Sequence, residues 1–337
     1  MSIFYSIVTF IFVFFILVFF HELGHFVTAK IFKIKVNEFF LGFGPKIFEK
    51  KYNETSYNIR LFPLGGAVAL EGEEQTNIYD PNAFSNKPLI IQFLVVFAGP
   101  TMNFIVAFVI FVLLGINLGT QGTVITNISE NSLAYNNGLK INDKILSINE
   151  NKINNWYDII DNIKNNKNLE FVVKRDSDIV KISFLKENDN SPIGINCYSK
   201  NINDILVNSA NQVINISKQM LNIIPKLFYD NEVQKTVTGP IGIYKIIDKA
   251  SKTNFIIIME ITAILSINLG IMNFLPIPAL DGGRLFFLLI SIILKQFNIN
   301  LNSKYEEIIH KLGFVILMVL TFILIIKDIF NPLEVIF

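Results

Sequence analysis

The residues best suited to chemistry are the pentapeptide His21-Glu22-Leu23-Gly24-His25. On an α-helix, two histidines four positions apart project from one face, so both imidazoles can bind a single Zn²⁺. The glutamate that follows the first histidine can then act as general base toward an attacking water. The spacing H-E-x-x-H is typical of zinc peptidases, and it predicts His21 and His25 as metal ligands and Glu22 as the catalytic base.

The setting of this motif is a hydrophobic segment that runs from Ile3 to Phe20, where Ser6 and Thr9 are the polar exceptions. A segment of this length can span a bilayer. Ionisable groups inside a span cost about 2.5 to 3.5 kcal/mol each on insertion scales, so they are expected to have a function. The alternative, a chance motif with structural histidines, is weakened because two of the three histidines of the chain lie in it. A zinc site here predicts hydrolysis inside the membrane.

Composition indicates a membrane protein with a polar insertion. Of the 337 residues 51% are hydrophobic, yet Asn, Lys and Asp crowd the middle of the chain. The net charge of +1 gives no indication of nucleic-acid binding. The single cysteine, Cys197, excludes an internal disulfide and a cysteine-based zinc finger, so the metal needs histidine and carboxylate ligands. The N-terminus lacks a basic region and a small-residue cleavage site, and is predicted to be retained as a helix.

Four hydrophobic blocks are predicted to form the membrane part, at about 3–29, 88–118, 255–294 and 308–326. As one straight helix the third block would be about 60 Å long, twice the hydrocarbon thickness, so it must break. The break is predicted at Pro276, Pro278 and Gly282-Gly283. Two alternatives remain: two spans joined by a tight hairpin, or one span that ends in an unwound segment followed by a surface-lying helix.

The basic residues predict the orientation of the spans. No Lys or Arg precedes Lys30, whereas the segment 30–87 is rich in both, so that segment is predicted to be cytoplasmic and the N-terminus to lie outside. Residues 119–253 are then extracytoplasmic. With four spans, the motif at 21–25 and Asp281 both lie toward the cytoplasmic ends of their spans, and are expected to meet at one depth.

Asp281 is the predicted third ligand. Carboxylates in apolar surroundings are functional by default, and two histidines with one carboxylate and an open position form a catalytic zinc site. The alternative is a turn-forming Asp-Gly-Gly at the membrane boundary. Glu260, near the outer end of its span, is predicted to be structural.

Three further segments have readable patterns. Residues 122–197 alternate as strands with two short helices, at 133–137 and 156–163, and predict one PDZ domain. Its groove either binds extended peptide by strand addition, or the domain acts as a steric plug. Residues 39–70 predict a small sheet, with a plain cytoplasmic loop as the alternative. Residues 203–229 predict an amphipathic helix, either on the outer leaflet or packed against the PDZ domain.

Six ordered motifs together resemble the site-2 protease family, and within it the bacterial intramembrane zinc metalloproteases of the regulator of sigma-E protease type. These motifs are Phe20-His21-Glu22-Leu23-Gly24-His25, Gly42-Phe43-Gly44-Pro45, Phe62-Pro63-Leu64-Gly65-Gly66, Phe97-Ala98-Gly99-Pro100 leading to Asn103, Gly239-Pro240-Ile241-Gly242-Ile243, and Asn273 through Gly283. The resemblance implies zinc binding by His21, His25 and Asp281, a general base at Glu22, and a hold on the substrate backbone by Asn273. It also implies that the β element around Gly42, Phe43 and Gly44 offers an edge to extended substrate.

The predicted fold class is an α-helical polytopic membrane protein of about four transmembrane helices, with a small membrane-associated β element and one extracytoplasmic PDZ domain of α+β type. The predicted division is 1–118, a first membrane unit; 119–199, the PDZ domain; 200–253, an amphipathic connector; and 254–337, a second membrane unit. Some relatives in the family carry two PDZ domains, whereas this chain has room for one.

The resemblance implies an intramembrane zinc metalloendopeptidase, Zn²⁺ as its cofactor, and a multi-pass location in the bacterial inner (plasma) membrane. Its expected partners are the lipid bilayer and single-span substrates such as anti-sigma factors or remnant signal peptides, with no nucleic acid. The alternatives are a catalytically inactive membrane scaffold that displays a PDZ domain, and a zinc transporter, which the lack of a second metal site or internal repeat disfavours.

Overall fold

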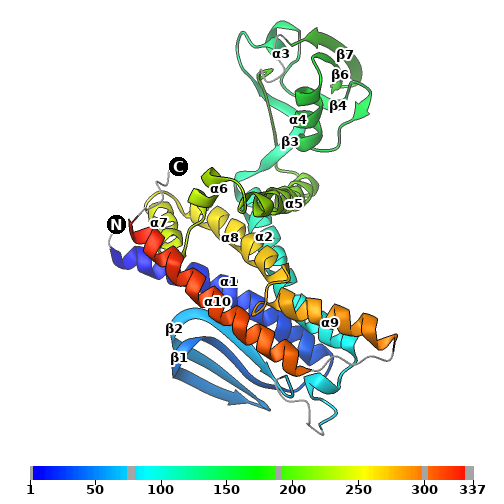
Figure 1. Cartoon of the computed structure of the whole chain (residues 1–337). Helices are drawn as coiled ribbons and strands as arrows, with labels where there is room; N and C mark the ends of the chain where they lie inside the picture. Colours follow the sequence, from blue (N-terminus) through cyan, green and yellow to red (C-terminus); the bar gives the residue numbers. More distant parts are fainter. Residues whose placement is uncertain (1–2, 74–79, 187–191, 298–302, 331–337) are drawn as a thin grey trace. The chain divides into compact units, whose positions relative to one another are not determined.

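Long apolar helices dominate the computed structural model, which describes residues 3–73, 80–186, 192–297 and 303–330 (Figure 1). Residues Met1–Ala107 together with Asn215–Phe337 form one compact unit, here called the membrane unit. Residues Phe108–Ile214 form a second, here called the sheet unit.

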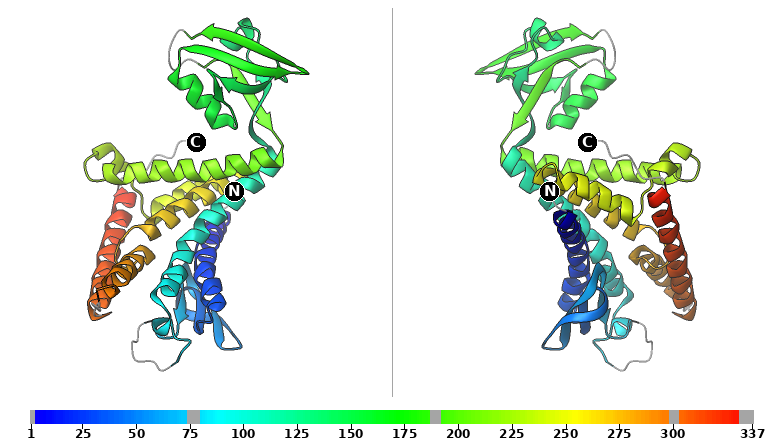
Figure 2. Two further views of the ribbon diagram at one scale, coloured as in Figure 1. Left: turned by 90° about the vertical axis from the view of Figure 1, so that its right-hand side faces the viewer. Right: turned by 90° about the vertical axis from the view of Figure 1, so that its left-hand side faces the viewer.

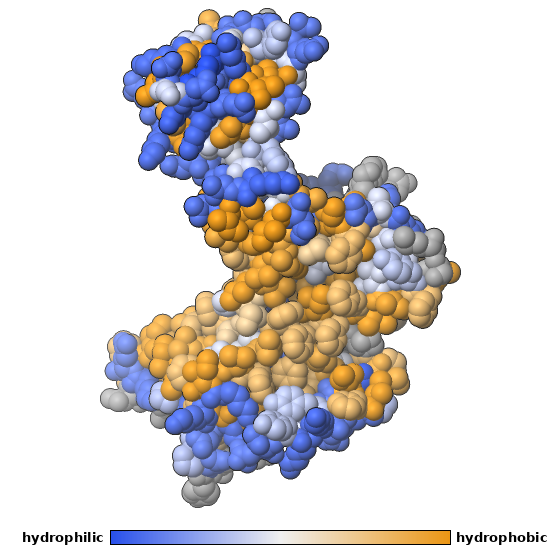
Figure 3. Space-filling model, turned by 180° about the vertical axis from the view of Figure 1, so that it is seen from behind, coloured by the Kyte–Doolittle hydropathy of each residue, from blue (hydrophilic) through white to orange (hydrophobic). Residues whose placement is uncertain are grey.

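Four helices in the described ranges are long and apolar enough to cross a membrane, as predicted. They are α1 (Ile3–Ile31), α2 (Leu89–Leu118), α8 (Phe255–Phe274) and α10 (Ser303–Phe330). Large apolar side chains stay exposed along α1 and α10, among them Phe12, Phe15, Phe314 and Phe322. Figure 3 shows apolar side chains gathered over the helices of the membrane unit, as expected for surfaces that face lipid.

The third hydrophobic block breaks after Phe274, and helix α9 (Asp281–Lys295) follows. At 15 residues α9 is about 22 Å long, short of the roughly 30 Å hydrocarbon core, which supports a surface-lying helix over a second span. The prediction that Gly282-Gly283 break the helix is wrong, because both lie in the first turn of α9. A Cβ at Gly282 would meet the Leu275 carbonyl oxygen at 1.9 Å, so these glycines let α9 pack on the unwound segment instead.

Residues 36–70 form the predicted small sheet from two long strands, β1 (Val36–Tyr52) and β2 (Thr55–Leu70). The hairpin folds back on itself, since Phe39 pairs with Val68 on one side and with Tyr57 on the other. Residues 66–70 form an edge, with no pairing on their outer side among the described residues. Phe39, Val68 and Leu70 share a buried cluster with Ala29 of α1 and Val95 of α2, and both views of Figure 2 show the hairpin beside α1.

Close helix crossings in the membrane unit depend on glycine. A Cβ at Gly24 would lie 2.4 Å from the Ala98 carbonyl oxygen of α2, and one at Gly270 of α8 would lie 2.7 Å from the Phe104 ring. Small residues allow helices to approach closely where burial of apolar surface gives no driving force, as in lipid. The three helices α1, α2 and α8 therefore meet around these positions.

Two short helices connect helix α5 (Ile202–Lys226) to α8, and the second is held by the end of α10. They are α6 (Asn231–Thr236) and α7 (Pro240–Ser251). The buried carboxylate of Asp328 accepts hydrogen bonds from the N–H groups of Gly239 (3.0 Å) and Gly242 (2.8 Å) at the start of α7. An acidic group satisfies and stabilises a helix N-terminus. A Cβ at Gly239 would lie 3.0 Å from the Asp328 carboxylate and one at Gly242 would lie 3.3 Å from it, so both glycines leave room for this group.

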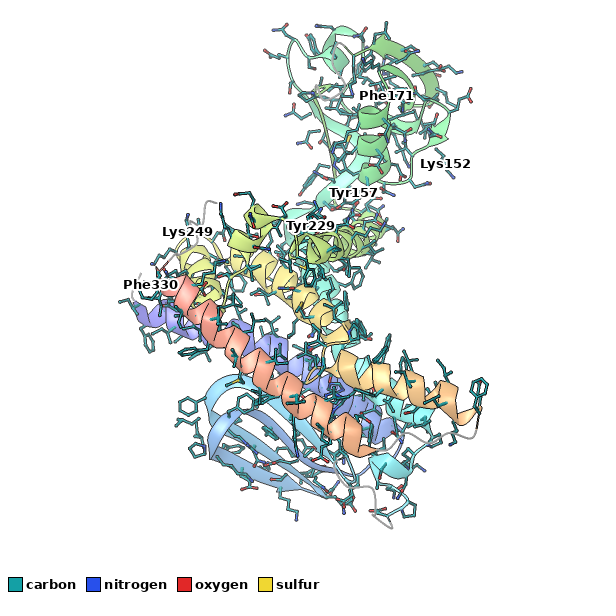
Figure 4. All side chains as sticks on the ribbon, in the orientation of Figure 1. Lys152, Tyr157, Phe171, Tyr229, Lys249 and Phe330 are labelled. Carbon is teal, nitrogen blue, oxygen red and sulfur yellow. The ribbon has the colours of Figure 1, made fainter. Side chains whose placement is uncertain are left out.

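The sheet unit is built on a six-stranded sheet of order β7-β6-β4-β3-β8, with β5 paired to β4. Phe171, labelled in Figure 4, lies fully buried in its core. The predicted strands and both predicted short helices are present, while the short strands β5 and β8 were not predicted. The assignment of this unit as a PDZ domain, and the four-part division of the chain, stay predictions. The elements are β3 (Thr120–Ile128), α3 (Leu133–Asn136), β4 (Lys144–Ile148), β5 (Asn151–Lys152), α4 (Trp156–Asn165), β6 (Asn168–Arg175), β7 (Asp178–Leu185) and β8 (Ile195–Ser199).

Two further elements lie within the described residues. Helix α5 (Ile202–Lys226) forms where the amphipathic helix was predicted, with Ile205, Asn208 and Ser209 buried. A single 3-10 turn, η1 (Phe84–Asn86), precedes α2.

Candidate metal centre

His21, His25 and Asp281 come together although Asp281 is distant in sequence. Their ligand atoms all lie within 4.8 Å of one another. Oδ2 of Asp281 lies 2.9 Å from Nε2 of His21 and 3.3 Å from Nε2 of His25. The one-turn spacing on α1 puts both imidazoles on one face, and the start of α9 brings the carboxylate to them. The structure thus unites the three residues that the sequence selected.

Hydrogen bonding fixes the ring of His25. Its Nδ1 lies 2.9 Å from the carbonyl oxygen of Val95 on α2. Because a carbonyl oxygen only accepts, Nδ1 carries the proton and donates, which leaves the lone pair of Nε2 directed at Asp281 and His21. Gly99 provides the space for this ring, since a Cβ there would lie 2.1 Å from Nε2.

Asp281 is held in place by the segment before it. Ala279 adopts a left-handed backbone conformation with φ 76°, and its N–H donates to Nδ1 of His310 on α10 at 3.0 Å. A Cβ at Gly313 would meet Pro278 at 2.4 Å, so α10 also packs directly on this segment. His310 was not predicted as part of the site. The one feature of the sequence that could have indicated it is that His310 is the histidine outside the H-E-x-x-H motif.

The three residues fit a zinc ion. Oδ2 of Asp281 is buried and accepts no hydrogen bond from the described residues, although two imidazole nitrogens lie beside it. Lone pairs that face one another repel unless a cation lies between them. Two neutral imidazoles and one carboxylate, with room for a fourth ligand, are the donor set of catalytic zinc sites. The donor chemistry therefore matches the metal that the motif predicts.

A cavity of 740 Å³ in the membrane unit contains this centre. Glu22 and Asn273 both line it and are largely buried, at 8% and 7% exposure. The lining of the cavity also includes residues 65–73, which form the end of β2 and the segment directly after it. A Cβ at Gly66 would lie 3.2 Å from Cγ of Glu22, so the edge of the sheet comes into contact with the predicted base.

Gly42, Phe43 and Gly44 lie on β1 and do not belong to the wall of this cavity. Both glycines have positive φ, 87° and 89°, where the strand bends. The Phe43 ring packs over Gly65, because a Cβ at Gly65 would meet Cε2 of Phe43 at 2.4 Å. Phe43 thus packs on the residue that precedes the edge segment, and direct contact of Gly42, Phe43 and Gly44 with substrate stays a prediction.

An ion pair crosses the cavity wall. Arg284 of α9, three residues after Asp281, pairs with Glu73, which follows β2. Both residues line the cavity. The pair joins the helix that carries Asp281 to the end of the edge segment. Sequence reasoning used Arg284 only as a basic residue for orientation.

Comparison with known proteins gives a consistent result. The family model of peptidase family M50 matches residues 9–320. A putative zinc metalloprotease of Fusobacterium nucleatum is 35% identical over 94% of this chain and 96% of its own length. A putative zinc metalloprotease of Clostridium acetobutylicum is 34% identical, over 98% and 99%. The regulator of sigma-W protease RasP of Bacillus subtilis is 31% identical, over 96% and 98%.

Proposed function

Because this chain belongs to peptidase family M50 and is a zinc metalloprotease of the membrane, we propose that it cleaves transmembrane proteins at a zinc centre held by His21, His25 and Asp281. The observation that carries the proposal is the meeting of these three ligand atoms, in one cavity with Glu22. Two of the ligands lie on a helix that is long and apolar enough to span the bilayer.

Glu22 is proposed as the group that moves the proton. Zinc, when bound, supplies a Lewis acid that polarises the scissile carbonyl and makes water a stronger nucleophile. Glu22 takes a proton from the attacking water and returns it to the nitrogen of the leaving amine as the C–N bond breaks. Asn273, at the last turn of α8, lines the same cavity and is proposed to hydrogen-bond the substrate backbone.

The edge formed by residues 66–70 is proposed to hold the substrate. A helical peptide bond is hydrogen-bonded and shielded, so a transmembrane substrate must unwind before water can attack it. An unpaired strand edge offers N–H and C=O groups to an extended chain. This edge lines the cavity and comes into contact with Glu22 at Gly66, which supports strand addition beside the base.

Membrane-bound regulators and remnant signal peptides are the proposed substrates. One relative is a regulator of sigma-W protease, and by that likeness we include anti-sigma factors. Two other functions are an inactive scaffold and a zinc transporter. The intact set of ligands and base weakens the first, and the second is disfavoured because the described residues hold one group of metal-ligand type.

We propose that the chain lies in the bacterial inner membrane with residues 30–87 in the cytoplasm and the sheet unit outside, from the distribution of basic residues. Single cysteines at Glu54 and Lys181 test this orientation. Burial raises the pKa of the native Cys197 thiol to about 12, and Cys197→Ser removes the remaining background. In spheroplasts with an intact inner membrane, a membrane-impermeant maleimide should label the cysteine at position 181 and should not label the cysteine at position 54. Labelling of Glu54→Cys before permeabilisation contradicts the orientation.

Glu22→Gln tests the function. The ligands remain, so the purified full chain should keep about one zinc, while cleavage of a model transmembrane substrate falls by about 10² to 10⁴ or more. Glu260→Gln is the matched control, because Glu260 is an exposed glutamate on α8, and it should cleave like wild type. Asp281→Ala should lose both zinc and cleavage. Wild-type cleavage by Glu22→Gln rules out the assigned base.

A further inference from the structure

Asn103 is a buried amide on α2 at the centre of the membrane unit. Its exposure is 0%, and its side chain reaches Nδ1 of His21 at 3.1 Å. Its own backbone carbonyl accepts a hydrogen bond from Oγ of Ser266 on α8 at 2.8 Å, which holds α2 and α8 together at this point. A buried amide without hydrogen bonds costs several kcal/mol, so this contact with the histidine defines the position of Asn103.

The contacts alone allow two orientations of the amide. As placed, Nδ2 faces His21, and Oδ1 is buried without a partner among the described residues. Asparagine oxygen and nitrogen are distinguished by their hydrogen-bond network rather than by shape. If Nδ2 donates to Nδ1, the ring proton of His21 must sit on Nε2, and Nε2 has no lone pair for a metal. If the amide is turned over, Oδ1 accepts from Nδ1–H and Nε2 is free.

We propose that Asn103 is a positioning residue, which holds His21 in its Nδ1–H tautomer through Oδ1 and thereby directs the Nε2 lone pair into the metal centre. The inference rests on the proposed role of His21 as a zinc ligand. Helix α2 then supplies one acceptor for each imidazole: the Val95 carbonyl for His25 and the Asn103 amide for His21.

A neutral acceptor suits this location. Asp281 and Glu22 already place two carboxylates in the cavity, so an amide orients the ring without adding a third negative charge. Groups that orient a metal-bound histidine through its second nitrogen affect metal affinity by about 10- to 100-fold when removed. Asn103 should therefore act on zinc affinity before it acts on any step of peptide hydrolysis.

Three variants of the full chain in detergent or bilayer discs test the proposal. Asn103→Leu keeps the size of the side chain and removes the acceptor, and its zinc affinity should fall by about 10- to 100-fold, measured by competition with a chromophoric chelator. Asn103→Asp keeps an acceptor oxygen and should bind zinc as tightly as wild type or more tightly. Asn117→Leu replaces an exposed asparagine on the same helix and should change nothing.

A second measurement reads the tautomer itself. The chain has only three histidines, so the ring ¹⁵N spectrum of histidine-labelled protein can be assigned. Before and after zinc removal, His21 of the wild type should carry its proton on Nδ1, and Asn103→Leu should shift it toward Nε2 in the zinc-free state. A packing role would leave this signal unchanged.

The outcomes separate the two proposals. A wild-type His21 with its proton on Nε2, or equal loss of zinc in Asn103→Leu and Asn103→Asp, overturns the role of Asn103. So does full affinity in Asn103→Leu. Zinc retained at wild-type affinity by His21→Ala instead overturns the ligand assignment of the proposed function. If Asn103→Leu fails to fold, the wild-type spectrum and Asn103→Asp still decide.

Discussion

Two aspartates, Asp143 in the sheet unit and Asp281 in the membrane unit, differ in how their carboxylates are paired. In the sheet unit, Asp143 accepts from Nε and Nη2 of Arg175, both at 2.7 Å, and from the Lys140 N–H at 2.9 Å. In the membrane unit, Asp281 leaves Oδ2 without a hydrogen bond from the described residues, beside two imidazoles. A buried carboxylate is normally fully paired, so an incompletely paired one marks a place for a cation.

The same contrast extends to the surroundings of each aspartate. The sheet unit encloses Phe171, Ile145 and Ile148 in a core of its own, and the Asp143–Arg175 pair joins the residue before β4 to the end of β6. The membrane unit instead brings helices together at glycines, and all three histidines of the chain belong to it. Asp143 with its full set of partners therefore belongs to a unit with its own packed core, whereas Asp281 lies in the cavity proposed for the chemistry.

Gly99→Ala should have the largest effect, and it tests whether the metal centre depends on close helix packing. The added Cβ would lie 2.1 Å from Nε2 of His25, with no space on the α2 side, so the ring must move. Displacement of a reacting group by about 1 Å can cost about 100-fold in rate. Cleavage should fall at least that far and zinc content should drop, measured on the purified full chain.

Thr101→Ala is the control for this substitution, since Thr101 lies on the same turn of α2, is partly exposed, and bonds the Phe97 carbonyl of its own helix. It should keep zinc and cleavage. Full zinc content in Gly99→Ala would mean that the centre tolerates a shift of His25, and that the helix crossing is not what sets its geometry.

Asp143→Asn should have an intermediate effect, confined to the sheet unit. It leaves Arg175 without its charge partner, and should lower the free energy of unfolding by about 1 to 3 kcal/mol. The single tryptophan, Trp156, packs against the core of this unit and reports its unfolding by fluorescence in urea. Zinc content and cleavage of a short substrate should not change. Asp161→Asn, at an exposed aspartate on α4, is the matched control.

The pH dependence of stability is a second test of the Asp143–Arg175 pair. Burial alone would raise the pKa of Asp143, but hydrogen bonds from Arg175 and the Lys140 N–H outweigh it and hold the pKa below its ordinary value of 3.8. A depressed folded pKa contributes stability above the unfolded pKa, and that contribution is lost as pH falls through the folded value. Wild type should lose its advantage over Asp143→Asn as the pH falls below about 3.8. An unchanged difference at low pH argues against the ion pair as its source.

The candidate metal ligands could be predicted from the sequence where helical periodicity or proline determines their positions. The one-turn spacing of His21 and His25 requires only that the segment is helical, and the prolines at 276 and 278 require a break before Asp281. The support for these residues could not be predicted, because it depends on contacts between distant elements. His310 reaches Ala279 only because α10 packs on the segment at Pro278, and Asn103 reaches His21 only because α1 and α2 cross at Gly24.

The fold-back of the β hairpin could not be predicted from the sequence either. Alternation within 39–70 predicts strands, but period-2 alternation does not state which strand lies at an edge. The double pairing of Phe39 makes 66–70 the edge and turns it toward Glu22. The prediction of a helix break at Gly282-Gly283 was wrong for a related reason. A glycine pair is compatible with a helix break and with a close approach of two segments, and only tertiary packing decides between them.

Deletion of residues 122–197, the greater part of the sheet unit, should have the smallest effect on chemistry. It tests whether the two units are independent. Gln121 of β3 pairs with Tyr198 of β8, so the ends left by deleting residues 122–197 lie on adjacent strands, about 5 Å apart, and a short Gly-Ser linker can join them. The contacts of Tyr198 with Leu118 and of Ser199 with Asp204 lie outside the deletion. Every proposed ligand and the base belong to the membrane unit.

The deleted chain should therefore keep about one zinc and cleave a short, trimmed substrate near the wild-type rate. If the domain acts as a size filter, cleavage of substrates with a bulky outer domain should rise, measured with a matched pair of substrates that share one transmembrane segment. The same deletion in Glu22→Gln should cleave neither, which excludes a contaminating protease. Loss of cleavage of the short substrate, with zinc retained, would show instead that residues 122–197 position the substrate. Stability and chemistry would then not be divided between the two units as the contrast between Asp143 and Asp281 suggests.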